Sequence, residues 1–441
     1  MIPRSRGRYR GLLPVDIESR FTMTENREFD LVLFGATGFV GQTTARYLAE
    51  AAPVGARIAL AGRSAAKLSA LRTGLGPAAA EWELVAADAG DPDALSALAG
   101  RTAVVITTVG PYQRYGLPLL AACARHGTHY ADLTGESIFT RTAIDRYHDR
   151  AVATGAKIVN SCGFDSIPSD LSVYQLHQAV VADNAGALGE TTLIATMKGG
   201  ISGGTVDSAR AMWETIAAEP AARVAITDPY SLSPDRSREP RRGGPSDHAL
   251  GRAKRIAPDL DGWIGTFVMA PHNTKIVRRS NGLLGWAYGP DFRYREVLNA
   301  GAAPAAPLIA AATAGSVVAG MGAVAVLSRS RFGRRLLDRV LPAPGTGPDE
   351  AARAAGWFRT ATHTRTSTGA TYMATFAGQG DPGYQATAVM LAESGLCLAF
   401  DRARSPERAG VLTPATAMGD ALTERLRAAG MSIEVTAGRA A

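Results

Sequence analysis

Three glycines recur at every third position directly after a short apolar run, FDLVLF at residues 29–34. Gly35 would permit a tight turn, Gly38 would let the main chain approach a pyrophosphate, and Gly41 would allow the next helix to pack closely. The start of that helix presents free N–H groups, which favour negative charge. Because a strand precedes the turn and a helix follows it, the pattern favours a dinucleotide site over a purely structural turn. The predicted phosphate-binding turn consists of Gly35, Ala36, Thr37, Gly38, Phe39, Val40 and Gly41.

The residues after the second apolar run indicate which dinucleotide binds. An NAD site would place Asp or Glu about 20 residues beyond the glycine turn. The chain instead reads Ala-Gly-Arg-Ser at 61–64, and a guanidinium and a hydroxyl suit a 2′-phosphate, although Arg63 could also be solvated surface. NADP(H) is therefore the predicted cofactor. Its further predicted contacts are Arg63, Ser64 and Lys67 at the 2′-phosphate, Asp88 at the adenine edge, and Val109, Gly110 and Pro111 beside the nicotinamide.

The chain around these residues alternates between strand and helix patterns up to about residue 160. Strands are predicted at residues 29–34, 57–61, 82–87, 103–108, 129–133 and 157–160, with helices at 42–51, 64–75, 91–98 and 117–126. Such alternation predicts an α/β fold whose N-terminal part is a Rossmann-type doubly wound parallel sheet.

The rest of the chain cannot be read as simple βαβ units. Strand patterns at 191–197, 265–270, 357–366 and 370–376 indicate a second, α+β domain. We expect a disordered tail or start-site extension at 1–22, an NADP-binding domain at 23–165, a substrate and dimerisation domain at 166–400, and a segment at 401–441 that returns to the first domain.

Composition excludes several classes of protein. The net charge of +7 is modest, and no basic helix with interleaved aromatic residues appears, so nucleic acid is not expected as a partner. Cys123, Cys162 and Cys397 are isolated in sequence, which indicates a reducing compartment. No CxxC, HExxH or close His and carboxylate cluster indicates a metal site.

Residues 308–327 form a run of 20 residues without a charge, followed by five arginines between 329 and 339. As a helix this run would be roughly 30 Å long, close to the thickness of a bilayer core. Three readings stay open: contact with a membrane surface, a buried or dimer-interface helix, and a membrane span. Membrane-surface contact is favoured, and a homodimer is expected.

Several separate motifs, in one order, resemble the saccharopine dehydrogenase-like oxidoreductases. They are GATGFVG (35–41), AGRS (61–64), TTVGPYQRYG (107–116), HYADLTGE (129–136), CGFDSIPSD (162–170) and GVLTPATAMGDAL (410–422). Within that group the chain most resembles the actinobacterial trans-acting enoyl reductases. The resemblance implies reduction of an α,β-unsaturated acyl chain on a polyketide synthase or carrier protein, in cell-envelope lipid synthesis. With the apolar run at 308–327 and the arginines after it, we expect a cytoplasmic enzyme at the inner face of the plasma membrane.

Reduction of an enoyl thioester needs a donor at the thioester oxygen and a proton for the α-carbon. The candidate catalytic residues near the strand carboxyl ends are Tyr112, Tyr130 and Asp165, with Asp132 and Glu136 as further donors. Tyr112 is the first choice because it directly follows the Gly-Pro turn. Each of them could instead only pack a turn or cap a helix.

Two other functions compete with this one. A saccharopine-type amino-acid oxidoreductase would need several convergent arginines for a polyanionic substrate, and Arg278 and Arg279 could supply them. A non-catalytic, membrane-associated dinucleotide-binding protein would bind NADPH without oxidising it.

Overall fold

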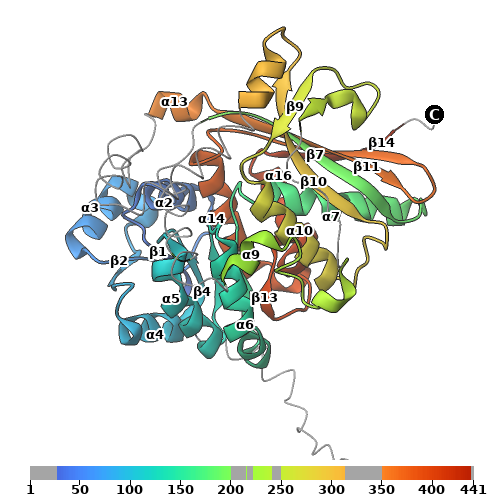
Figure 1. The fold of residues 1–441 in the computed structure, drawn as a ribbon. Coiled ribbons are helices and arrows are strands. Elements are labelled where there is room, and N and C mark those ends of the chain that lie inside the picture. Colours follow the sequence, from blue (N-terminus) through green and yellow to red (C-terminus); the bar gives the residue numbers. More distant parts are fainter. Residues whose placement is uncertain (1–26, 200–214, 216–221, 241–249, 313–349, 439–441) are drawn as a thin grey trace, which may run out of the picture.

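The structure is a computed structural model, and the residues that it describes are 27–199, 215, 222–240, 250–312 and 350–438. Within these residues the chain forms two seven-stranded sheets, and helices pack on and between them (Figure 1). The predicted tail at 1–22 lies outside the described residues, as do the arginines between 329 and 339.

The first sheet is entirely parallel, with the order β13-β6-β5-β4-β1-β2-β3. Its strands are β1 (Phe29–Phe34), β2 (Ile58–Gly62), β3 (Glu83–Ala86), β4 (Thr102–Thr107), β5 (His129–Asp132), β6 (Lys157–Val159) and β13 (Gly410–Leu412). Its helices are α2 (Phe39–Ala51), α3 (Ala65–Leu75), α4 (Pro92–Arg101), α5 (Tyr112–His126) and α6 (Ser137–Thr154). The predicted doubly wound sheet is confirmed. The strand order reverses between β1 and β4, and ligands of such sheets bind at the carboxyl ends beside that point.

The second sheet is mixed, as the α+β prediction requires, with the order β14-β12-β11-β7-β10-β9-β8. Only β7 and β10 pair in parallel; the other pairs are antiparallel. Its strands are β7 (Leu188–Lys198), β8 (Gly251–Arg252), β9 (Trp263–Thr266), β10 (Arg293–Gly301), β11 (Trp357–Thr366), β12 (Thr371–Gln379) and β14 (Ser432–Ala437). Further α-helices are α7 (Ile167–Ala182), α9 (Arg223–Thr227), α10 (Ala270–Leu283), α13 (Glu350–Ala354), α14 (Gln385–Phe400), α15 (Pro414–Ala417) and α16 (Gly419–Ala428).

Helix α14 joins the two sheets into one core. It packs on α2, β1, β4 and β5, although the prediction placed residues 385–400 with the second region. A Cβ on Gly395 would lie 2.7 Å from both Leu31 and Ile106, so only glycine allows this approach. Farther along, β13 pairs with β6 of the first sheet and β14 pairs with β12 of the second. The last 40 residues therefore contribute to both sheets.

Several element boundaries differ from the prediction, and two of these differences have an identifiable local cause. Helix α5 begins at Tyr112 rather than at residue 117, because the carboxylate of Glu136 accepts hydrogen bonds from the first two N–H groups of the helix. The strand predicted at 265–270 ends at Thr266, and helix α10, which has a mostly polar sequence, begins four residues later.

The apolar run at 308–327 lies mostly outside the described residues. Residues 306–312 are helical and mark its beginning. Across the parts of the chain that the structure describes, no helix has the length and apolar character needed to cross a membrane.

A chain of polar contacts ties the C-terminal helices to the first domain. The hydroxyl of Tyr47 on α2 donates to Glu393 Oε1 on α14 at 2.5 Å, and Arg425 Nε on α16 lies 2.6 Å from Glu393 Oε2. Arg425 Nη1 also donates to Asp401 at 2.8 Å. The Glu393 side chain is buried, and these hydrogen bonds offset the cost of its burial.

We expect Glu393→Ala to lower the free energy of unfolding by about 3 kcal/mol, because Arg425 would lose its main buried counter-charge. Urea unfolding followed by circular dichroism measures the change. Glu424→Ala is the matched control: Glu424 neighbours Arg425 on α16, and its loss breaks only an exposed ion pair with Arg404, which should cost less than about 1 kcal/mol. Equal effects of the two variants would contradict the structural role of the buried network.

Candidate cofactor and substrate site

The glycines of the turn after β1 are required for different reasons. Gly35 has a φ of +87°, and a Cβ there would lie 2.7 Å from Val109 Cγ2. A Cβ on Gly41 would lie 2.2 Å from the carbonyl oxygen of Gly35. Gly38 differs, because it is exposed and a Cβ there would meet only the Gly35 oxygen, at 3.3 Å. Packing thus explains glycine at 35 and 41, whereas at 38 the fold leaves space above the main chain, as a bound phosphate needs.

The N-terminus of α2 is open to an anion, because no acidic or capping side chain of the helix occupies it. Its first turn contains no acidic residue, and no side chain caps it. Helix α5, which begins at the same sheet edge after Val109, Gly110 and Pro111, is closed by Glu136: Oε1 accepts from Tyr112 N at 2.9 Å and Oε2 from Gln113 N at 2.7 Å. Because a carboxylate repels phosphate, α2 is the better anion site of the two.

The residues predicted around the 2′-phosphate lie together beside β2 and β3. The Arg63 side chain is 81% exposed, and its Nε lies 3.9 Å from Asp88 Oδ2. Ser64 caps helix α3 by accepting from Lys67 N at 3.3 Å, and Asp88 accepts from Gly90 N at 2.7 Å. The exposed cations at this point are therefore Arg63 and Lys67, while Ser64 and Asp88 also shape the local main chain.

The two tyrosines predicted as proton donors point into the protein. The hydroxyl of Tyr112 donates to the Thr107 carbonyl at 3.0 Å and accepts from Leu133 N at 3.1 Å. Tyr130 donates to Asp132 Oδ2 at 3.0 Å. Burial raises the pKa of both phenols well above the ordinary value. This geometry favours structural roles for Tyr112 and Tyr130 over the predicted catalytic ones.

The loop after β6, residues 160–166, is fixed at its beginning by Asp132 and His272. Asp132 accepts from Ser161 N at 2.9 Å and Asn160 Nδ2 at 2.7 Å. Ser161 has a φ of +65°, and its hydroxyl donates to the Thr134 carbonyl at 2.6 Å and lies 2.9 Å from His272 Nε2. We therefore assign the ring proton to Nε2. Burial lowers the pKa of His272 to about 3, so the ring is neutral.

The same loop is also fixed at its far end. Phe164 N donates to Thr387 Oγ1 at 2.9 Å, and Ser166 Oγ donates to Asn273 Oδ1 at 3.2 Å. Asp165 lies between these two anchors, and its partly buried carboxyl makes no hydrogen bond or ion pair with any residue the structure describes. Burial raises its pKa to about 7. Asp165 is thus a carboxyl on a rigid loop whose proton equilibrium lies near neutral pH.

Three residues of this arrangement were not predicted from the sequence. His272, Asn273 and Thr387 come from α10 and α14, more than a hundred residues from the loop that they hold. The one available signal was a run of polar side chains, HNTK at 272–275, within a segment that was not predicted as a helix.

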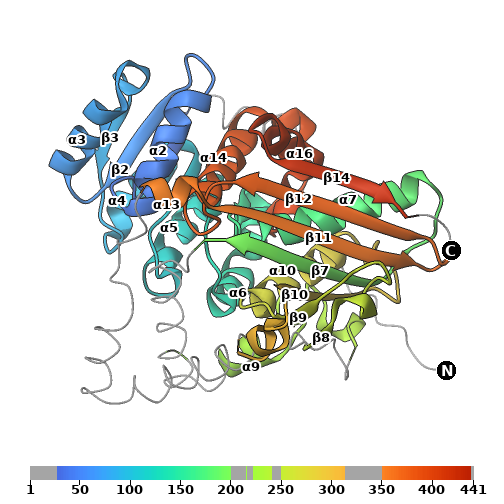
Figure 2. The same ribbon diagram turned by 90° about the horizontal axis from the view of Figure 1, so that it is seen from above.

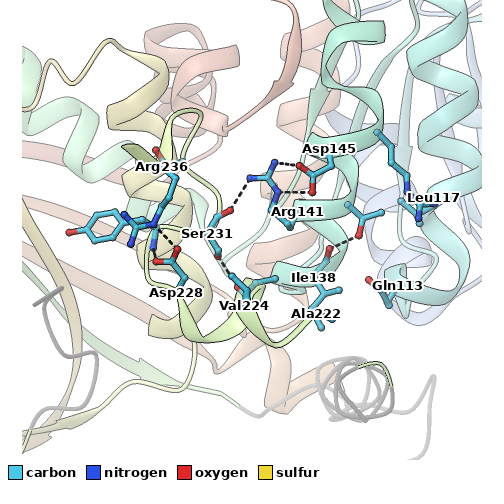
Figure 3. A pocket seen from close by; sticks show the side chains of 15 residues that line it. Gln113, Leu117, Ile138, Arg141, Asp145, Ala222, Val224, Asp228, Ser231 and Arg236 are labelled. Carbon is cyan, nitrogen blue, oxygen red and sulfur yellow. Dashed lines mark hydrogen bonds and ion pairs between the residues drawn. The ribbon is translucent and has the colours of Figure 1, made fainter. Parts of the chain in front are cut away.

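A cavity of about 630 Å³ opens between α5, α6 and residues 222–236 (Figure 3). Apolar side chains line part of it, among them Leu117, Ile138 and Val224. Arg141 on its wall pairs with Asp145 and donates to the Ser231 carbonyl at 2.9 Å. Gln113, on the first turn of α5, also lines the cavity, which therefore extends to the carboxyl edge of the first sheet.

Comparison with known proteins agrees with this geometry. Residues 31–186 match the family model of the saccharopine dehydrogenase NADP-binding domain. A trans-acting enoyl reductase of Mycobacterium tuberculosis is 52% identical over 413 residues, which are 93% of this chain and 98% of that protein. A trans-acting enoyl reductase of Mycobacterium ulcerans is 50% identical over the same shares of the two chains.

The fold as a whole also has a counterpart among solved structures. Apo saccharopine dehydrogenase (L-Glu forming) from Saccharomyces cerevisiae aligns with a TM-score of 0.53 and 13% identity, covering 92% of this chain and 99% of that one. At this identity the likeness concerns the fold alone. The open α2 terminus and the space above Gly38 fit a bound dinucleotide, and the predicted cofactor NADP(H) is confirmed by the matching family. The chain is therefore a member of the trans-acting enoyl reductases, within the saccharopine dehydrogenase-like, NADP-binding oxidoreductases.

Proposed function

We propose that this protein is an NADPH-dependent enoyl reductase that saturates the α,β double bond of an acyl thioester on a polyketide synthase or carrier protein. The names and high identity of its relatives support the reaction class. The observation that carries the proposal is the placement of Asp165, a rigidly held carboxyl, at the same sheet edge as the open α2 terminus. A reductase of this kind needs an anion site for its cofactor and an acid beside it.

The reduction adds a hydride to the β-carbon and a proton to the α-carbon, and the nicotinamide supplies the hydride. Negative charge then develops on the thioester oxygen. Asp165 is the donor that the geometry supports, because its protonated form is substantially populated near pH 7 and its loop is anchored on both sides. After transfer, the Asp165 carboxylate regains a proton from solvent.

We place the acyl chain and its carrier arm in the cavity between α5, α6 and residues 222–236. Leu117, Ile138 and Val224 offer apolar surface for an acyl chain, and Gln113, whose Oε1 has no partner among the described residues, can accept a hydrogen bond from an amide of a carrier arm. The cavity also extends to the sheet edge, where the double bond must meet the hydride.

The saccharopine-type alternative loses its main support. Arg278 donates to the carbonyl oxygens of Pro229 and Tyr294, at 3.0 and 2.9 Å. Arg279 is fully buried and donates to those of Leu232 and Val411, at 2.7 and 2.6 Å. Both guanidinium groups therefore hold the main chain together, and neither is placed to receive a polyanionic substrate.

The finer parts of the proposal rest on sequence. The role in cell-envelope lipid synthesis, the contact with the inner face of the plasma membrane and the homodimer are supported by the family resemblance and by the apolar run at 308–327 with its arginines. Most of that run lies outside the described residues.

The test of the proposed reaction is NADPH oxidation with a panel of enoyl thioesters, each presented as a free thioester and on a carrier protein. We expect oxidation with carrier-bound enoyl chains and formation of the saturated acyl product. Stoichiometric NADPH binding without turnover of any enoyl thioester would favour the non-catalytic binding protein instead.

We expect NADPH to bind at least about tenfold more tightly than NADH, which corresponds to about 1.4 kcal/mol and is within reach of one charge-assisted phosphate contact. Arg63→Asp should abolish or reverse this preference, since a carboxylate at this exposed position repels a 2′-phosphate. Isothermal titration calorimetry with both nucleotides measures the ratio. Equal affinities in the unmodified protein would contradict the assignment of Arg63.

We expect kcat to fall as pH rises through about 7, because the raised pKa of Asp165 means that the acid is lost by deprotonation there. Asp165→Asn should lower kcat by about a hundredfold or more and remove this pH dependence. Asp149→Asn, at an exposed position on α6, should leave both unchanged.

The same variant has a distinct stability signature. The folded-state pKa of Asp165 lies above its ordinary value, so between about pH 4 and 7 the native state holds a proton that the unfolded state releases, and stability falls as pH rises. Asp165→Asn should therefore gain stability relative to the unmodified protein from pH 5 to pH 8. If Asp165→Asn shows this gain in stability but an unchanged kcat, Asp165 is a buried acid without a catalytic role.

A further inference from the structure

An arginine from the second region of the chain lies at the start of α2. Figure 2 shows α13 beside α2, and the guanidinium carbon of Arg353 lies 4.8 Å from the ring centroid of Phe39. Phe39 is the first residue of α2, next to Gly38. The ring of Tyr384 packs edge-on against Phe39 at 4.9 Å. Two side chains from beyond residue 350 therefore adjoin the phosphate-binding turn.

The main chain that carries Arg353 is firmly attached. The Arg353 carbonyl accepts from Gly356 N at 3.2 Å and from Asp381 N at 2.9 Å, and Gly380 N donates to the Gly356 carbonyl at 2.9 Å. A Cβ on Gly356 would lie 2.6 Å from Asp381 N, so glycine is needed there. The turn at 380–384 that holds this segment also supplies Tyr384. The position of Arg353 over Phe39 is thus set by the fold around it.

We propose that Arg353 binds the pyrophosphate of the dinucleotide, so that the cofactor is held from both regions of the chain. The first turn of α2 offers N–H groups and a partial positive charge but contains no basic residue, and the pyrophosphate carries two negative charges. A guanidinium beside that turn supplies the missing full charge and can bind phosphate oxygens in pairs. Arg63 is assigned to the phosphate on the 2′-oxygen of the ribose, whereas the pyrophosphate is attached to the 5′-oxygen, so the two arginines act on different phosphates.

This division of roles gives the test. NADPH, NADH and adenosine 2′-monophosphate are titrated by calorimetry into the full chain and into Arg353→Met, with folding verified by circular dichroism. Because both nicotinamide dinucleotides contain the pyrophosphate, we expect the Kd of each to rise about tenfold while their ratio stays the same. The Kd of adenosine 2′-monophosphate, which lacks the pyrophosphate, should stay within about twofold.

Two further variants separate charge from packing. Arg353→Lys keeps the charge and should recover part of the loss for both dinucleotides. Arg359→Met removes the same charge from an exposed position on β11 and should leave all three affinities unchanged. Affinities for NADPH and NADH within twofold of the unmodified protein in Arg353→Met would overturn the proposal and leave Arg353 as a packing residue for Phe39. Since only binding is measured, this outcome does not depend on whether the enoyl reductase proposal holds.

Discussion

The site depends on one buried carboxylate, that of Asp132. Burial of an unpaired carboxylate is very unfavourable, and here it raises the pKa of Asp132 to about 6. Four donors offset that cost: the N–H groups of Thr134 and Ser161, the amide of Asn160 and the hydroxyl of Tyr130. Thr134, Asn160 and Ser161 belong to the two loops at the carboxyl ends of β5 and β6, whereas Tyr130 lies on β5 itself. The carboxylate thereby fixes the separation of the two loops that border the proposed reaction site.

The second region of the chain completes this arrangement. Helix α10 supplies His272 and Asn273 to the loop after β6, and α14 supplies Thr387 to the same loop. Helix α14 also packs on β1 and β4, so the helix that supplies Thr387 is itself in contact with the first sheet. The position of Asp165 is therefore determined by contacts from both regions, which is why a carboxyl that has no hydrogen-bond partner among the described residues can still be held in place.

The first sheet could be predicted because its elements depend on interactions between residues close in sequence. The glycine turn, the buried parallel strands and the helix caps at Ser64 and Asp91 depend on residues within a few positions of one another, so the sequence alone indicates them. The start of α5 depends on Glu136, more than 20 residues away, and was predicted five residues too late. Helix α10 was missed because its buried face carries Arg278 and Arg279, whose charges are accommodated by distant carbonyl groups. Asp165 was among the predicted donors, but nothing local distinguishes it from Tyr112.

The contrast between α2 and α5 shows how the fold directs an anionic cofactor. Both helices begin at the carboxyl edge of the sheet beside the reversal of strand order, and both present N–H groups there. Glu136 occupies the start of α5, and its negative charge excludes a phosphate from that position. The same carboxylate allows α5 to begin directly after the Gly110-Pro111 turn, and Val109, which precedes that turn, lies beside Gly35. The Glu136 side chain thus has two effects at this edge of the sheet. It orders the turn before α5, and its negative charge leaves the N-terminus of α2 as the favourable site for the phosphates of the cofactor.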